Sequence, residues 1–121
     1  MNAAIWARVS TTQQETENQV VQLRAHAAQR GLEVVEVYRV EESAFKGHHR
    51  PALNRVLTDA RAGRFDVLMV WALDRLERGG ALATMQTWGR FNQAGVQVIS
   101  HQEPWTEVAG DMRELLLAIT G

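Results

Sequence analysis

The chain has 121 residues, of which 45% are hydrophobic, and its formal net charge is −1. This length suits one domain with a single core, and this hydrophobic content excludes an intrinsically disordered protein. The absence of cysteine excludes disulfides, thiolate metal sites and a cysteine nucleophile. No apolar run approaches the roughly 20 residues of a membrane span, and the N-terminus lacks a signal-peptide pattern, so we expect a cytoplasmic protein without a membrane partner.

Strands and helices alternate along the first half of the chain. Residues 3–9 form a short apolar run with β-branched members, which predicts a buried strand. Residues 14–30 place apolar side chains on one helical face, and Gly31 supplies the stop. Residues 32–40 are rich in valine and predict a second strand, and residues 41–49 are polar and predict a loop.

The same alternation continues in the second half. Residues 51–62 have the apolar spacing of a helix, with Pro51 at a first position where its missing N–H is not needed. Residues 66–73 are apolar almost without interruption, which is typical of a strand inside a parallel sheet covered on both faces. Residues 80–94 predict a helix and residues 96–100 a fourth strand.

The C-terminal part completes the prediction of the fold. Residues 103–110 are rich in turn formers and leave room for a short fifth, antiparallel edge strand. Asp111 and Glu114 form a capping box for a last amphipathic helix, which we expect to be the start of a longer C-terminal helix in a longer parent protein. The alternation predicts a three-layer α/β/α fold with a mostly parallel sheet of four strands, as one domain over residues 1–121.

Chemically active residues gather at one predicted edge of this sheet. In open α/β sheets, ligands bind beyond the carboxyl ends of the strands. The residues at or after three of these ends are Arg8, Ser10, Arg50, Asp74, Arg75 and Arg78. Taken singly, Ser10 suits a helix N-cap and Asp74 a surface ion pair. Together, four arginines match the charge of a phosphate in its five-coordinate state, and serine can form a covalent intermediate.

Four segments in the same order resemble the catalytic domain of serine site-specific recombinases of the resolvase/invertase family. Residues 6–14 (WARVSTTQQ) resemble its opening signature, and Gln19 in the next helix is similar too. Residues 43–53, with Gly47 and RPAL, resemble its second motif, and residues 65–78, with LDRL, its third. Residues 100–105, with EPW, resemble the end of the domain. Any one motif is weak, but four in register are strong.

The resemblance implies a residue-by-residue mechanism. Ser10 attacks the scissile DNA phosphate and becomes joined to a 5′ end, and Asp74 matches an acid that protonates the leaving 3′ oxygen. The phosphate-binding arginines correspond to Arg8, Arg50, Arg75 and Arg78, and the supporting positions to Gln14, Gln19, Glu41 and Ser43. No metal and no other cofactor is implied. The implied partners are DNA and further copies of the chain, in a dimer and a tetramer of the full-length protein.

The sequence departs from the family pattern at several positions. Trp6 replaces a usual Tyr, which we interpret as a packing change. Glu77 stands where Gly is common, so its carboxylate either weakens phosphate binding or faces solvent. We find no helix-turn-helix domain and no zinc-ligand cysteines, so we expect the family's separate DNA-binding region to lie outside these residues. Glu77 is the one feature that favours the alternative function, a catalytically impaired domain that only self-associates.

Other interpretations of the fold are less consistent with these residues. A receiver-type regulatory domain needs an acidic cluster after its first strand, where this chain has Arg8 and Ser10. A serine hydrolase of the α/β type needs Gly-x-Ser-x-Gly, which is absent. His48 and His49 lack a third ligand at zinc spacing, so we interpret them as solvated loop residues. Three tryptophans are expected in the core, whereas Trp105 is expected in an open turn.

Overall fold

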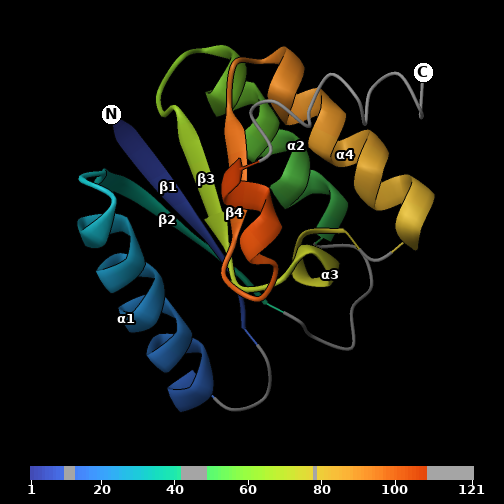
Figure 1. Cartoon of the computed structure of the whole chain (residues 1–121). Coiled ribbons are helices and arrows are strands. Elements are labelled where there is room, and N and C mark those ends of the chain that lie inside the picture. Colours follow the sequence, from blue (N-terminus) through green and yellow to red (C-terminus); the bar gives the residue numbers. More distant parts are fainter. Residues whose placement is uncertain (10–12, 42–48, 78, 109–121) are drawn as a thin grey trace.

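The computed structural model describes residues 1–9, 13–41, 49–77 and 79–108. The elements in chain order are β1 (Asn2–Val9), α1 (Gln13–Gln29), β2 (Glu33–Glu41), α2 (His49–Arg61), β3 (Val67–Val70), α3 (Leu73–Leu76), α4 (Ala81–Gln93), β4 (Gln97–Ser100) and the 3-10 helix η1 (Pro104–Val108). The strand order is β2-β1-β3-β4, and all neighbouring strands are parallel (Figure 1). This confirms the predicted parallel sheet of four strands.

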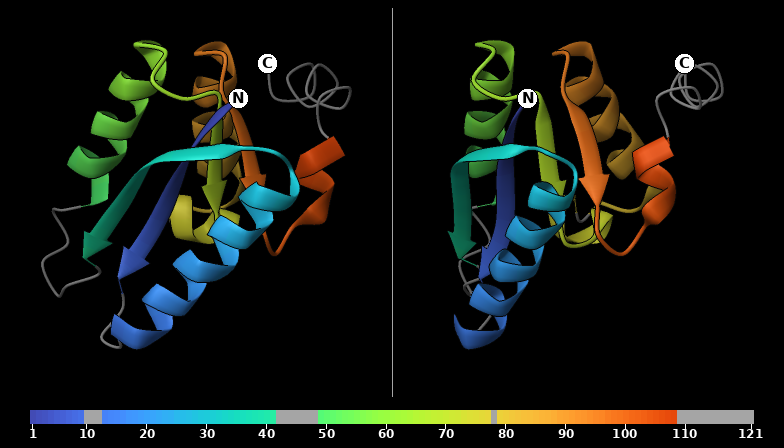
Figure 2. Two further views of the ribbon diagram at one scale, coloured as in Figure 1. Left: turned by 90° about the vertical axis from the view of Figure 1, so that its left-hand side faces the viewer. Right: turned by 60° about the vertical axis from the view of Figure 1, so that its left-hand side comes forward.

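Helices cover both faces of the sheet, which confirms the predicted three layers (Figure 2). On one face, Leu23 of α1 packs with Ile5 of β1. On the other face, Val56 of α2 and Phe91 of α4 pack with Leu68 of β3. All five side chains are fully buried. Central parallel strands need apolar residues on both faces for this reason, and their sequences are therefore continuously apolar.

Two glycines end the first two long helices in the way that the sequence predicts. Gly31 follows α1 with a φ of 70°, and Gly63 follows α2 with a φ of 75°. A positive φ is strained for residues with a Cβ atom, and glycine adopts it readily. Each chain reversal leads directly into the next strand and keeps consecutive strands parallel.

The third strand is shorter than the sequence predicts. The apolar run over residues 66–73 was expected to be one strand, but β3 ends at Val70 and Leu73 begins α3. The backbone N–H of Leu73 donates to the carboxylate of Glu103, with 3.0 Å between nitrogen and Oε1, so it is not available to a strand. Leu73 and Leu76 are buried, which explains their apolar character without a strand.

The expected fifth strand is not present in the described residues, because Pro104–Val108 forms η1 instead. Pro104 has no N–H to donate to a strand ladder. The Thr106 hydroxyl accepts the N–H of Ser100 at 2.8 Å and donates to the carbonyl of Glu103 at 2.8 Å, which folds the segment back on β4. The predicted last helix, residues 111–121, lies outside the described residues. Within those residues, no helix has the length and apolar character needed to cross a membrane.

Candidate functional site at the carboxyl ends of the strands

The carboxyl ends of the parallel strands meet at one edge of the sheet, which we call the carboxyl rim. The Nη1 atom of Arg8, near the end of β1, lies 3.4 Å from the carbonyl oxygen of Asp74 in α3. Arg8 is partly exposed, and Asp74 is exposed. The prediction that the end of the first strand and the LDRL motif lie together is therefore confirmed for these residues. Ser10, Ser43 and Arg78 lie outside the described residues.

Trp6 joins β1 to α3 from inside the core. Its side chain is 1% exposed, and its indole Nε1–H donates to the carbonyl of Arg75 at 2.8 Å. The expectation of a packing role holds, but sequence reasoning missed the hydrogen bond. A buried indole N–H usually has a hydrogen-bond partner, so the sequence predicts that Trp6 needs an acceptor. The sequence does not show which residue supplies that acceptor. This hydrogen bond holds α3, and with it Asp74 and Arg75, in position against β1.

Arg50 reaches the carboxyl rim from the first turn of α2. Its Nη2 atom lies 3.4 Å from Oε1 and 3.3 Å from Oε2 of Glu77, which directly follows α3. The Arg50 side chain is 54% exposed, whereas the Glu77 side chain is 3% exposed. Glu77 also accepts the hydroxyl of Thr87 at 2.7 Å and the N–H of Gly79 at 3.3 Å. The expectation that Glu77 could face solvent is therefore wrong, because its carboxylate is satisfied inside the protein.

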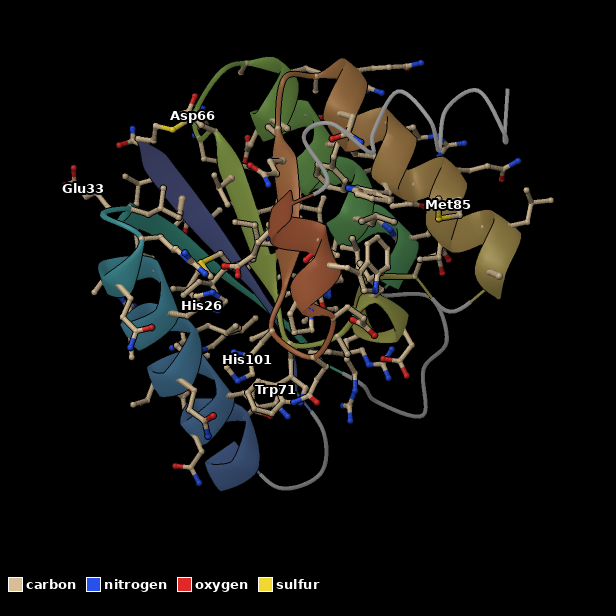
Figure 3. All side chains as sticks on the ribbon, viewed as in Figure 1. His26, Glu33, Asp66, Trp71, Met85 and His101 are labelled. Atoms are coloured by element: carbon tan, nitrogen blue, oxygen red, sulfur yellow. The ribbon has the colours of Figure 1, made fainter. Side chains whose placement is uncertain are left out.

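A pocket of about 650 Å³ opens beside these residues. It is lined by Arg8, Leu73, Asp74, Glu77, Gly80, Ala81, Thr84, Met85, Glu103 and Trp105. One side of the pocket is charged, and the side formed by α4 and η1 is largely apolar. Figure 3 shows Met85 on α4 near this side. Trp105 is 39% exposed, as expected for an open turn, and its ring meets the buried Trp88 edge to face at 5.4 Å.

Glu103 supports the start of α3, and sequence reasoning did not assign it a role. Its Oε1 atom accepts the N–H of Leu73 and the hydroxyl of Ser100. A carboxylate at the beginning of a helix satisfies an N–H that has no partner within the helix. Glu103 therefore ties the residues that follow β4 to the segment that carries Asp74 and Arg75.

The predicted supporting residues lie on the elements around the carboxyl rim. Gln14 is in the first turn of α1, and Glu41 is the last residue of β2, opposite Val9 in the strand register. The side chains of Gln14 and Glu41 lie outside the described part of the structure. Gln19 of α1 is 8% exposed, so it is buried under the helix.

A second polar cluster joins α1 to η1, and His26 of this cluster is labelled in Figure 3. His26 Nε2 lies 2.6 Å from Glu107 Oε1, and Arg30 donates to both oxygens of the same carboxylate at 2.9 and 2.7 Å. Burial alone would raise the pKa of Glu107, but the hydrogen bonds and charges of His26 and Arg30 outweigh it and lower that pKa. Trp71 is partly exposed and stacks on His101 beside this cluster at 4.7 Å, so it is only in part the core residue that was expected.

Comparisons with known proteins agree with this geometry. The chain is similar to the C-terminal catalytic domain of ISC1926 TnpA, an IS607-like serine recombinase, with a TM-score of 0.73 and 26% identity over 95% of this chain and 79% of that one. It is also similar to the corresponding domain of IS1535 TnpA, another IS607-like serine recombinase, with a TM-score of 0.63 and 29% identity over 96% and 81%. A resolvase family site-specific recombinase from Streptococcus pneumoniae shares the fold, with a TM-score of 0.76 and 24% identity over 98% and 85%.

A comparison with curated proteins gave no match. The family model described as "Resolvase, N terminal domain" matches residues 3–121, which is nearly the whole chain and includes every element of the carboxyl rim. The parallel sheet, the short helix carrying Asp74 and Arg75 and the resemblance of the motifs all agree with that match. The chain therefore belongs to the resolvase N-terminal domain family.

Proposed function

We propose that this chain is the catalytic domain of a serine recombinase, which cleaves and rejoins DNA through a 5′-phosphoserine intermediate. The observation that carries the proposal is the contact between Arg8 and the backbone of Asp74. It brings the residue two positions before Ser10 to the segment that holds Asp74 and Arg75. A serine nucleophile, a carboxylic acid and several arginines are the groups that phosphoryl transfer requires.

The proposed reaction has two reversible steps. The Ser10 hydroxyl attacks the scissile phosphorus and gives its proton to solvent water, and the bond from phosphorus to the 3′ oxygen breaks. Asp74 protonates the leaving 3′ oxygen, which leaves a free 3′ hydroxyl and a 5′ phosphate esterified to Ser10. Rejoining is the reverse attack by a 3′ hydroxyl, which releases Ser10. One phosphate ester replaces another in each step, so no nucleotide is consumed.

The arginines carry the electrostatic part of this proposal. Arg8, Arg50, Arg75 and Arg78 would bind the phosphate oxygens as negative charge builds up in the transition state. Loss of one such donor costs about 3 kcal/mol of transition-state stabilisation, which is on the order of 10²-fold in rate. Their effects should not add, since they act on one phosphate as a unit. Gln14, Gln19, Glu41 and Ser43 would support their positions, and no metal would be needed.

The wider setting is part of the same proposal. The partners would be DNA and further copies of the protein, as a dimer that pairs into a tetramer on two DNA sites, in the cytoplasm. Selection of a DNA sequence would depend on a region other than this domain. A net charge near zero supports weak binding of DNA by the domain itself.

The test uses a suicide DNA substrate, whose nicked strand is lost after cleavage so that the covalent adduct accumulates. In the full-length protein, we expect the wild type to form the adduct in the presence of excess chelator and Ser10→Ala to form none. Thr58→Ala is the matched control, because it removes an exposed hydroxyl on α2. Adduct formation by Ser10→Ala, or a requirement for magnesium, would refute the proposal. Wild-type protein that self-associates but forms no adduct would support the catalytically impaired alternative.

A further inference from the structure

Glu77 is a buried carboxylate beside Arg50 at the carboxyl rim. Its side chain is 3% exposed, and its partners include Thr87 of α4, the N–H of Gly79 and Arg50 of α2. A buried carboxylate that stays ionised must be compensated by charge and hydrogen bonds. The guanidinium of Arg50 supplies positive charge directly to this carboxylate, so the position of each group depends on the other.

The two ends of this pair differ in their surroundings. Glu77 lies inside the protein, whereas the Arg50 side chain is 54% exposed. One nitrogen of the guanidinium, Nη2, is directed to the carboxylate at 3.3 Å. Arginine has five N–H donors in a planar fork, so the contact uses one edge and leaves donors for an outer anion. The order from the inside outward is therefore Thr87, Glu77, Arg50 and solvent.

Metal sites use a similar arrangement, in which a carboxylate behind a metal-binding residue holds that residue in the orientation needed to bind the metal. A flexible arginine must lose conformational freedom when it binds phosphate. A carboxylate fixed by Thr87 removes part of that cost in advance, because it holds the guanidinium before DNA arrives. If the Glu77 carboxylate only competed with the DNA phosphate for the arginines, it would need to be exposed beside them. The Glu77 side chain is instead buried.

We infer that Glu77, fixed by Thr87, is a positioning residue that holds the Arg50 guanidinium for the scissile phosphate. The inference rests on the proposed function, since it assigns Arg50 to phosphate binding. Glu77 itself does not touch DNA. It acts in the transition state through Arg50, so its loss should lower the rate of cleavage more than the affinity for DNA.

The experiment measures single-turnover adduct formation on the suicide substrate over a range of DNA concentrations. Glu77→Gln should lower the maximal rate by about 10-fold or more, as is typical when a residue behind a ligand-binding group is replaced, and change the half-saturating DNA concentration by less than about 3-fold. Thr87→Val should shift the rate in the same direction by a smaller factor. Glu107→Gln is the matched control, because it removes another arginine-paired carboxylate, whose residue contacts Gln97 at the opposite end of β4 from the carboxyl rim. It should leave the rate unchanged.

Two further measurements separate positioning from a general loss of structure. In an Arg50→Ala background, Glu77→Gln should have less than about a 2-fold effect, because a residue that acts through Arg50 has nothing left to position. Side-chain NMR of Arg50 in the unbound protein should show an ordered guanidinium that becomes mobile in Glu77→Gln but not in Glu107→Gln. This readout does not depend on activity.

The outcomes are distinguishable from those of the proposed function. Loss of adduct in Ser10→Ala together with a wild-type rate in Glu77→Gln would overturn this inference alone. A faster rate in Glu77→Gln would show that Glu77 competes with phosphate, and an unchanged Arg50 NMR signal would show that it does not hold the guanidinium. Either result overturns the positioning role. An adduct in Ser10→Ala would instead overturn the proposed function.

Discussion

The hydrogen bond between Trp6 and Arg75 can be measured by comparing two buried tryptophans. Trp6 and Trp88 are 1% and 3% exposed. The Trp6 indole N–H donates to the Arg75 carbonyl at 2.8 Å, whereas the buried Trp88 Nε1 has no hydrogen-bond partner among the described residues. Replacing each by Phe removes the same atoms from the core. The two variants differ in that Trp6→Phe loses a hydrogen bond, whereas Trp88→Phe loses part of its ring contact with Trp105.

The magnitude follows from these two environments. Both substitutions lose apolar contacts and leave a small cavity, which costs about 1–2 kcal/mol. Trp6→Phe also leaves the Arg75 carbonyl without its donor, which adds about 1–3 kcal/mol. Trp88→Phe removes a buried N–H that is unsatisfied within the described residues, which offsets part of its cavity term. We expect Trp6→Phe to lower the free energy of unfolding by about 1–3 kcal/mol more than Trp88→Phe does.

The assay is urea unfolding followed by far-UV circular dichroism, because tryptophan fluorescence itself changes in these variants. The dependence of the unfolding free energy on urea concentration should be the same for both variants, so that their unfolding midpoints can be compared directly. Trp6→Phe should also slow adduct formation, since α3 loses its link to β1, and Trp88→Phe should affect it less. Equal destabilisation by the two substitutions, or a larger effect at Trp88, would refute the assignment of the Trp6 bond.

Two other predictions concern the carboxylates beside β4. Glu107 has a lowered pKa in the folded protein, so its interactions stabilise the fold above the pKa of the unfolded chain, and this contribution is lost as pH falls through the folded pKa. Glu107→Gln should therefore reduce the free energy of unfolding at pH 7 by about 1 kcal/mol. At acidic pH, where the Glu107 carboxylate is protonated, the two proteins should have the same free energy of unfolding. A constant difference between them down to about pH 2 would contradict the ion pair. Glu103→Ala should cost about 1–3 kcal/mol, because the N–H of Leu73 loses its acceptor, and should slow adduct formation by displacing α3. The matched control is Gln102→Ala, on the exposed neighbouring residue, which should leave both stability and rate unchanged.

The sheet and its rim could be predicted from the sequence because both depend on local patterns. The continuous apolar run at Val67–Val70 indicates a strand covered on both faces, and Gly31 marks the end of a helix. Given parallel strands, the position of Arg8 next to the LDRL motif follows from the strand-end rule. The three layers follow from the alternation of strands and helices.

The remaining features depend on contacts between residues far apart in the chain. Trp6 and Arg75 are 69 positions apart, and Leu73 and Glu103 are 30 apart, so no local pattern shows that they meet. The short helix α3 has the same apolar residues as a strand end, and the hydrogen bond from the Leu73 N–H to Glu103 that supports its first turn is not visible in the local sequence. Burial of Glu77 was unpredictable for a similar reason, since an isolated Glu in sequence is usually exposed.

The most direct test of the central proposal is the chemical identity of the covalent adduct. Wild-type protein is trapped on the suicide substrate in excess chelator, digested, and mapped by mass spectrometry. The proposal predicts one modified peptide, with a DNA 5′ phosphate esterified to Ser10 and a free 3′ hydroxyl on the other strand end. An adduct at another residue, or one joined through a 3′ phosphate, would contradict it.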